Sequence, residues 1–97
     1  MDTCKQIFVS GHVQGVFFRD SIRNMANQLN LSGAVRNLRD GRVEVQVTGD
    51  DVGVQTLIKW LKIGPKFAKV STIDVIDCPR NYLEHFQDGC FEIWSTE

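Results

Sequence analysis

Two stretches of the chain carry the hydrophobic spacing of an amphipathic helix. In the first stretch, apolar residues recur every three or four positions: Phe18, Ile22, Met25, Ala26 and Leu29. The second stretch repeats this spacing with four residues: Val54, Leu57, Ile58 and Leu61. A single apolar stripe on each helix predicts that each buries one side against a partner and exposes the other.

Glycine, proline and aspartate mark where these two helices should begin and end. The first helix should start at Phe18 and end near Leu31, with Gly33 as its stop signal. The second should begin at Asp50–Asp51, which we interpret as capping residues rather than as a pair of catalytic acids. It should end at Gly64–Pro65, because glycine follows the last turn and proline comes after it.

Shorter runs of apolar and β-branched residues predict strands between and beside the helices. Ile7–Val9 is an apolar run between polar residues, and Val70–Ile76 is rich in β-branched side chains. In Arg42–Thr48 three valines alternate with polar residues, which is typical of an antiparallel strand with one covered face. Ala34–Leu38 and Phe91–Trp94 complete the set of expected strands.

Asp40–Gly41 separates two of these strands and is a strong signal for a hairpin turn. If the turn has two residues, Asn37 lies opposite Glu44. Asn37 would then point away from the face that carries Val43 and the two following valines, and hence out of the helix-covered core. A longer hairpin loop would change this pairing.

The expected order of elements is strand, helix, strand, strand, helix, strand, followed by a short last strand. This is the split β-α-β pattern of ferredoxin-like folds. We therefore expect an α+β sandwich of the βαββαβ type, with both helices on one face of a mainly antiparallel four- to five-stranded sheet. The length of 97 residues suits a single domain over residues 1–97.

Composition narrows the class of protein without indicating an activity. Hydrophobic residues make up 42% of the chain and charged residues 24%, which argues against a disordered or fibrous protein. A formal net charge of −1 gives no reason to expect a nucleic acid partner, and the polar strand faces favour a monomer. No apolar run approaches the ~18 residues of a membrane helix, and the N-terminal segment lacks a signal-peptide pattern. We therefore expect a cytoplasmic protein without a membrane partner.

The three cysteines, Cys4, Cys78 and Cys90, are widely spaced and odd in number. They form no Cys-x-x-Cys pair, so a metal site or a dithiol redox site has no support. We expect free, reduced thiols in or near the core. A bridge between Cys4 and Cys90 would require the first and last strands to lie close together.

The segment Gly11–Arg19 is the strongest candidate for chemistry, because a loop with two glycines leads from a strand directly into a helix. Glycines let backbone N–H groups curl around a small anion, and a helix N-terminus adds unpaired N–H groups. The guanidinium of Arg19 could bind a phosphate through two parallel hydrogen bonds. The spacing fits neither a Walker motif nor a dinucleotide fingerprint. A plain glycine turn followed by a surface arginine is the alternative.

The remaining candidates for catalysis are few. His12 and His85 lie in expected loops without metal-ligand spacing, and Ser10 and Ser21 lack the context of a nucleophilic serine. Any chemistry should therefore rest on anion binding and positioning, which suits phosphoryl transfer. Four lysines around the end of the second helix are expected to form a solvated face: Lys59, Lys62, Lys66 and Lys69.

At the glycine loop the sequence resembles the acylphosphatase family. Gly11–Arg19 matches every specified position of that family's first signature, G-x-V-Q-G-V-x-F-R. The second signature is a glycine, an aromatic residue, a valine, a basic residue and an asparagine. Gly33–Asn37 matches it except at Ala34, and Gly41 falls where the family has its hairpin glycine. Because Ala34 replaces a bulky aromatic residue, we expect altered packing near the site rather than lost activity.

The resemblance implies a small cytosolic hydrolase with a ferredoxin-like fold that acts without metal or cofactor. Such enzymes split the carboxyl-phosphate anhydride of a small acyl phosphate into a carboxylate and inorganic phosphate. By this resemblance Arg19 clamps the phosphate, and the side-chain amide of Asn37 holds the attacking water in line with phosphorus. Four backbone amides would bind the phosphate: those of Val13, Gln14, Gly15 and Val16.

Two hypotheses without catalysis remain. RNA-recognition modules share the βαββαβ layout, but they stack bases on aromatic residues of the central strands. Arg42–Thr48 contains no aromatic residue, and Phe8 alone is a poor substitute. A regulatory or anion-binding domain that no longer catalyses would normally have lost Arg19 or Asn37, and this chain retains both.

Overall fold

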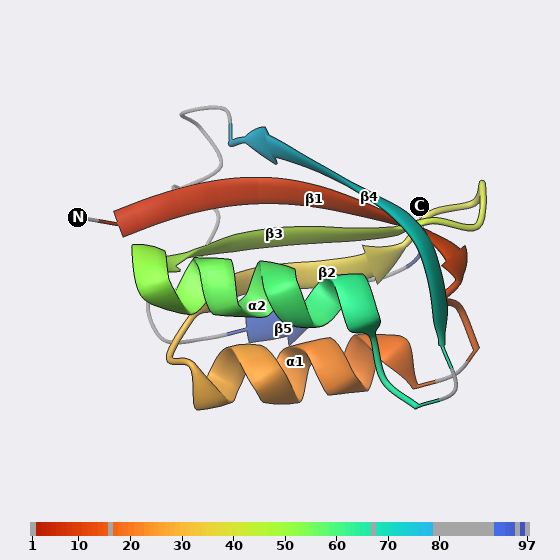
Figure 1. Cartoon of the computed structure of the whole chain (residues 1–97), viewed down its shortest axis with the longest axis horizontal. Coiled ribbons are helices and arrows are strands. Elements are labelled where there is room, and N and C mark those ends of the chain that lie inside the picture. Colours follow the sequence, from red (N-terminus) through yellow and green to blue (C-terminus); the bar gives the residue numbers. More distant parts are fainter. Residues whose placement is uncertain (1, 16, 67, 79–90, 95, 97) are drawn as a thin grey trace.

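The computed structural model describes residues 2–15, 17–66, 68–78, 91–94 and 96, and its elements follow the expected order (Figure 1). They are β1 (Asp2–His12), α1 (Phe18–Gln28), β2 (Ser32–Asn37), β3 (Val43–Asp50), α2 (Asp51–Ile63), β4 (Lys69–Asp77) and β5 (Phe91–Ile93). The predicted α+β, ferredoxin-like arrangement is therefore confirmed. Residues 79–90, which precede β5 in the chain, lie outside the described residues.

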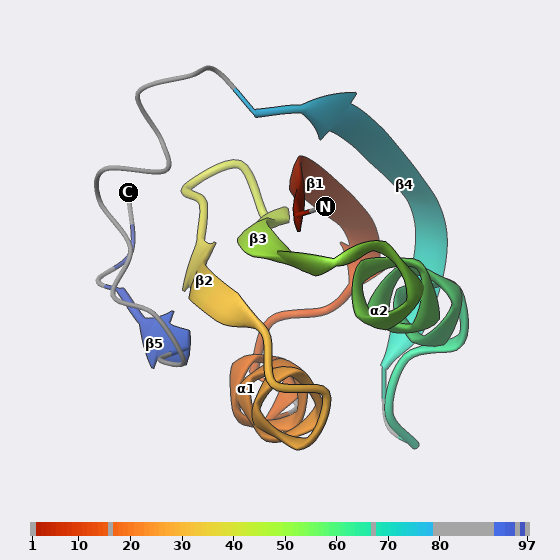
Figure 2. The same ribbon diagram turned by 90° about the vertical axis from the view of Figure 1, so that its left-hand side faces the viewer.

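The strands form one sheet in the order β4-β1-β3-β2-β5. All neighbours are antiparallel except β2 and β5, which are parallel. The strand expected at Ile7–Val9 extends over the 11 residues of β1, because β1 pairs with β3 on one side and with β4 on the other. Figure 2 shows the sheet curving around the two helices.

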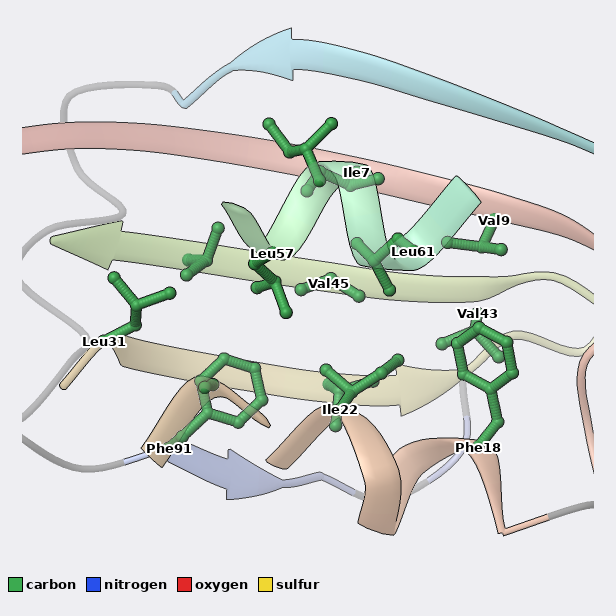
Figure 3. Close-up of a cluster of buried hydrophobic side chains, with 14 of the residues drawn as sticks. Ile7, Val9, Phe18, Ile22, Leu31, Val43, Val45, Leu57, Leu61 and Phe91 are labelled. Carbon is green, nitrogen blue, oxygen red and sulfur yellow. The ribbon is translucent and has the colours of Figure 1, made fainter. Parts of the chain in front are cut away.

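Both helices pack against the same face of the sheet, as predicted. Helix α1 contacts β2 and β5, and α2 contacts β1, β3 and β4. The apolar residues of the strands meet the helix stripes in one continuous core (Figure 3). Its fully buried members include Ile7, Val9, Ile22, Val43, Val45, Val47, Val54, Leu57 and Leu61.

Helix α1 ends earlier than the sequence predicted, and Gly33 does not stop it. The helix ends at Gln28, and Asn30 adopts the left-handed conformation with φ 57°. The backbone N–H of Leu31 donates to the carbonyl of Ala26 at 2.9 Å, which closes the C-terminal turn. Gly33 instead lies within β2, where a Cβ atom would collide with the carbonyl oxygen of Gln46.

Helix α2 has the ends that the sequence predicted. The carboxylate of Asp50 accepts a hydrogen bond from the backbone N–H of Gly53 at 2.6 Å, so Asp50 is a helix cap. Gly64 ends the helix with φ 75°.

The hairpin between β2 and β3 has a longer loop than a two-residue turn, and this corrects the expected register. The backbone N–H of Leu38 donates to the carbonyl of Arg42 at 2.8 Å, so three residues form the loop. Gly41 occupies its last position with φ 98°, as three-residue hairpin loops require. Asn37 therefore pairs with Val43 instead of Glu44, and its side chain belongs to the helix-covered face.

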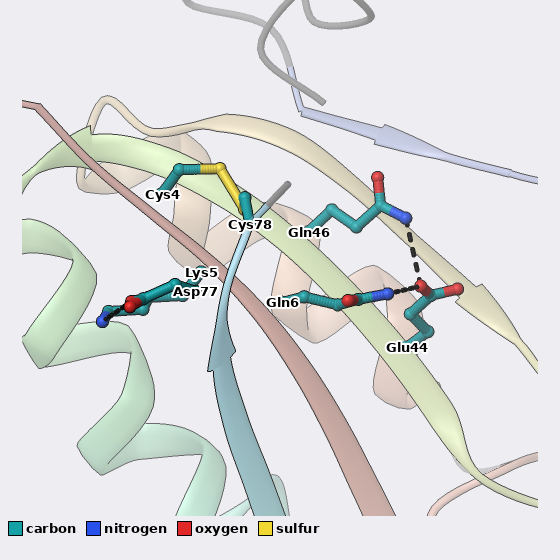
Figure 4. The surroundings of a disulfide bond; sticks show 7 residues. All are labelled: Cys4, Lys5, Gln6, Glu44, Gln46, Asp77 and Cys78. Atoms are coloured by element: carbon teal, nitrogen blue, oxygen red, sulfur yellow. Dashed lines mark hydrogen bonds and ion pairs between the residues drawn. A yellow bond between two sulfur atoms is a disulfide. The ribbon is translucent and has the colours of Figure 1, made fainter. Parts of the chain in front are cut away.

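Cys4 and Cys78 form a disulfide bond with a Cα–Cα distance of 5.4 Å (Figure 4). The expectation of free thiols is therefore wrong for these two residues. The antiparallel register pairs Lys5 of β1 with Asp77 of β4. Cys4 and Cys78 come next to this pair on the two neighbouring strands, so they lie opposite each other. The alternative bridge between Cys4 and Cys90 is not formed, since Cys4 is already bonded; Cys90 itself lies outside the described residues.

The face of the sheet opposite to the helices holds a buried polar cluster around Glu44 (Figure 4). Gln6 Nε2 donates to Glu44 Oε2 at 2.6 Å, Gln46 Nε2 to the same oxygen at 3.1 Å, and Arg36 Nε to Glu44 Oε1 at 2.6 Å. Burial by itself would raise the pKa of Glu44. The hydrogen bonds and the Arg36 charge outweigh it, so the pKa lies below its ordinary value.

We predict that Glu44→Gln lowers the free energy of unfolding by about 1–3 kcal/mol at pH 7. A carboxylate with a lowered pKa in the folded state stabilises the fold above its ordinary pKa, which is 4.5 for this group. That stability disappears as the pH falls below this value through the folded pKa. Urea unfolding at pH 7 and at about pH 3 should therefore show a wild-type advantage that shrinks in acid.

Glu92→Gln is the matched control, because Glu92 is exposed on β5. An equal loss in both variants, or a loss for Glu44→Gln that does not change with pH, would contradict the role given to the cluster.

Candidate active site

A cavity of about 290 Å³ opens where the loop after β1, the first turn of α1, the end of β2 and β5 meet. It joins polar groups from three segments that are far apart in sequence. The residues that line it are Val13, Gly15, Phe17, Phe18, Arg19, Asp20, Asn37 and Ile93. The two side chains predicted to carry chemistry, Arg19 and Asn37, therefore share one cavity.

The N-terminus of α1 reaches this cavity without a side-chain cap. The first backbone hydrogen bond of the helix runs from the N–H of Ser21 to the carbonyl of Phe17 at 3.1 Å. The N–H groups of the residues before Ser21 have no partner within a helix, and no side chain caps them. Helix α2 is capped by Asp50, so the open terminus is particular to α1 among the two helices described. An anion is the natural partner of such N–H groups.

The predicted loop leads directly into this helix terminus. Val13 and Gly15 line the cavity, with Gln14 between them in the chain. Gly15 has φ 75°, a conformation that favours glycine, although its surroundings would leave room for a Cβ atom. The fourth predicted amide, that of Val16, lies outside the described residues.

The guanidinium of Arg19 has no partner among the residues that the structure describes. Within the described part of the chain it makes no hydrogen bond and no ion pair, whereas other arginines are paired with carboxylates. Arg23 pairs with Asp20 at 3.2 Å and Arg42 with Asp40 at 2.8 Å. Arg19 therefore offers five N–H donors and a full positive charge to whatever enters the cavity.

The side chain of Asn37 also has an unused polar atom. Its Oδ1 is buried and has no hydrogen-bond partner among the residues that the structure describes. A buried acceptor without a partner is costly, so its position at a cavity wall favours a role in binding. The corrected hairpin register explains how Asn37 comes to face the cavity, because it shares the helix-covered face with Val43.

The side chain of Gln14 ties the loop to the hairpin that carries Asn37, and sequence reasoning missed this role. Its Nε2 donates to the carbonyl of Leu38 at 2.8 Å and to the carbonyl of Arg42 at 2.9 Å. Leu38 and Arg42 are the two residues that pair on either side of the three-residue hairpin loop. The only available signal was the place of Gln14 in the glycine motif, which gave no direction for its side chain.

The other sequence candidates that the structure describes do not line this cavity. His12, Ser10 and Ser21 are not among its lining residues, and His85 falls outside the described residues. Ala34 pairs with Gln46 on the opposite face of the sheet, so the expectation that it alters packing near the site is wrong. The four lysines near the end of α2 are exposed, as expected for a solvated face: Lys59, Lys62, Lys66 and Lys69.

Comparison with known proteins identifies the family to which this arrangement belongs. The acylphosphatase family model matches residues 5–91. The chain belongs to the acylphosphatase family. An acylphosphatase of Pseudomonas paraeruginosa is 47% identical over 83 residues, which cover 86% of this chain and 91% of the relative. This identity over nearly the full length confirms the resemblance seen in the two sequence signatures.

Solved acylphosphatase structures share the fold of this family member. The acylphosphatase of Bacillus subtilis superposes with a TM-score of 0.85 at 35% identity, covering 97% of this chain and 99% of the other. That of Coxiella burnetii gives a TM-score of 0.83 at 37% identity, covering 96% and 93%. The ferredoxin-like α+β fold therefore rests on close structural relatives as well as on the order of elements.

We predict that Gln14→Ala reduces kcat/KM for an acyl phosphate by about tenfold, because the loop loses both hydrogen bonds that hold it against the hairpin and the reacting groups shift. Gln55→Ala, at an exposed position of α2, is the matched control. Steady-state kinetics of both variants check the effect. Wild-type kinetics in a folded Gln14→Ala protein would show that the link between loop and hairpin does not position the site.

Proposed function

We propose that the protein hydrolyses acyl phosphates through a phosphate site at the α1 terminus and a water held by Asn37. Membership of the acylphosphatase family supports this activity, which is that of a hydrolase acting on acid anhydrides. The observation that carries the mechanism is the meeting in one cavity of three polar groups that have no partner in the described part of the chain. They are the guanidinium of Arg19, the uncapped N–H groups of α1, and Oδ1 of Asn37.

The phosphate end of the substrate would be held by charge and hydrogen bonds. In this proposal the phosphoryl oxygens accept hydrogen bonds from Arg19 and from the loop amides of Val13, Gln14, Gly15 and Val16. The positive end of the α1 dipole adds to the attraction. These donors face the oxygens on which negative charge is spread in the transition state, so they stabilise it without large rearrangement.

Asn37 would orient the nucleophile. Its Oδ1 is a hydrogen-bond acceptor without a partner among the described residues, so a water molecule can donate a hydrogen bond to it and direct a lone pair at phosphorus. A carboxamide is too weak a base to take the proton, so its part is orientation. The proton passes to a phosphate oxygen as the new P–O bond forms.

The leaving group needs little help in this reaction. The bond between phosphorus and the acyl oxygen breaks, and the electron pair leaves with a carboxylate, which is weakly basic and does not require a general acid. Positioning and charge stabilisation then suffice. On this ground we expect hydrolysis to proceed without metal or cofactor.

We also propose that the protein works as a monomeric single domain in the cytoplasm, on a small molecule rather than on nucleic acid. The guanidinium carbon of Arg42 lies 4.8 Å from the centroid of the Phe8 ring. This face of the ring is therefore covered and not free to stack on a base, which supports the absence of a nucleic acid partner. In the part of the chain that the structure describes, no helix is both long and apolar enough to cross a membrane.

We predict that Arg19→Ala and Asn37→Ala each lower the rate of phosphate release by about 10²–10³-fold while the protein stays folded. Release of inorganic phosphate from acetyl phosphate, measured with EDTA present, checks the loss. Arg39→Ala and Asn24→Ala remove the same residue types at exposed positions outside the cavity and should keep wild-type rates. Near-wild-type turnover in either site variant would place the chemistry elsewhere, and loss of activity with EDTA would contradict a metal-free reaction.

A further inference from the structure

Phe17 is a large apolar residue in two unfavourable situations at once. It is 80% exposed, and its backbone has φ 58° and ψ 25°, in the left-handed region that bulky residues rarely adopt. Strained residues of this kind cluster at binding and catalytic sites, where the strain holds a useful geometry. Phe17 also lines the cavity of the candidate active site.

The neighbouring Phe18 differs from Phe17 in that its aromatic ring is buried in the core. Phe18 is 1% exposed and packs against Trp60, with ring centroids 6.3 Å apart. The left-handed backbone at Phe17 separates the two rings, so that one enters the core and the other stays in the cavity wall. Burial therefore does not account for a phenylalanine at position 17.

The cavity wall has an apolar part beside its polar part. Phe17, Val13 and Ile93 contribute apolar side chains, whereas Arg19 and Asn37 contribute the polar groups. An acyl phosphate has the same two parts, an anionic phosphoryl group and a carbon chain or ring. When the phosphate lies at the α1 terminus, the acyl group has the apolar wall beside it.

The charge at the cavity wall adds a second criterion for which acyl groups can bind. Asp20 lines the cavity, and its carboxylate is half exposed and paired with Arg23 at 3.2 Å. A surface ion pair of this kind leaves much of the carboxylate open to solvent. An acyl group with its own negative charge would approach this carboxylate and be repelled.

We infer that Phe17 is a specificity-determining residue that binds the acyl group. The preferred substrates are acyl phosphates whose acyl group is apolar and uncharged, and aromatic acyl groups bind best. This inference rests on the proposed function, because it concerns the second half of the same substrate. The ring of Phe17 lies against the acyl group in both the bound substrate and the transition state, so it acts mainly on KM.

The experiment compares benzoyl phosphate with acetyl phosphate as substrates of the wild type, Phe17→Gly and Phe17→Leu. Glycine suits the left-handed backbone, so Phe17→Gly removes the ring without adding strain. We expect the wild type to prefer benzoyl phosphate. Phe17→Gly should reduce that preference in kcat/KM about three- to tenfold, mainly through KM, with Phe17→Leu in between. Ile63→Ala is the matched control, since Ile63 is 77% exposed and lies outside the cavity.

The charge criterion is tested with 4-carboxybenzoyl phosphate in place of benzoyl phosphate. The wild type should hydrolyse the charged compound less efficiently, and Asp20→Asn should narrow the difference about two- to threefold. A difference that Asp20→Asn leaves unchanged would overturn the role of Asp20.

The outcomes separate this inference from the proposed function. A wild type that releases phosphate from both substrates, with a preference that Phe17→Gly leaves unchanged, overturns the role of Phe17 and leaves acyl phosphate hydrolysis intact. A wild type that releases phosphate from neither substrate overturns the proposed function itself.

Discussion

The register of the β2–β3 hairpin is the constraint on which the site depends. In a sheet, a shift of one residue moves every side chain of a strand to the other face. The three-residue loop pairs Asn37 with Val43, which sends Asn37 to the helix-covered face beside the first turn of α1. The same register sends Arg36 to the opposite face, where it pairs with Glu44. One turn geometry thus separates Asn37, which we propose to hold the attacking water, from Arg36, which pairs with Glu44 on the other face of the sheet.

Polar side chains on the two faces of the sheet differ in whether they have hydrogen-bond partners. Around Glu44 each carboxylate oxygen accepts at least one hydrogen bond, and the resulting low pKa reports a satisfied charge. At the cavity, Arg19 and Asn37 have no protein partner among the described residues, and α1 has no cap. Leaving these groups unpaired costs stability, and so does the strained backbone of Phe17. The proposed function accounts for these costs, because Arg19, Asn37 and Phe17 all line the same cavity.

The sequence predicted those features that depend on local pattern. The apolar stripes placed both helices, and Asp50 and Gly64 marked the ends of α2. The pattern predicted Gly33 as the stop of α1, and this was wrong, because Gly33 is required by a close contact with β3 that forms only in the sheet. The disulfide between Cys4 and Cys78 was not predicted for a similar reason. It depends on the pairing of β1 with β4, which joins residues 74 positions apart. The two signatures led to Arg19 and Asn37, but the side-chain role of Gln14 needed the position of the hairpin carbonyls.

Hydrolysis in water enriched in ¹⁸O tests the central claim most directly, because it reveals which atom the water attacks. If Asn37 aims water at phosphorus while Arg19 and the loop hold the phosphoryl group, the label enters inorganic phosphate and the carboxylate remains unlabelled. Mass spectrometry of both products from a single turnover distinguishes the two sites of attack. Label in the carboxylate would mean attack at the carbonyl carbon, and it would contradict the proposed arrangement of Arg19, Asn37 and the α1 terminus.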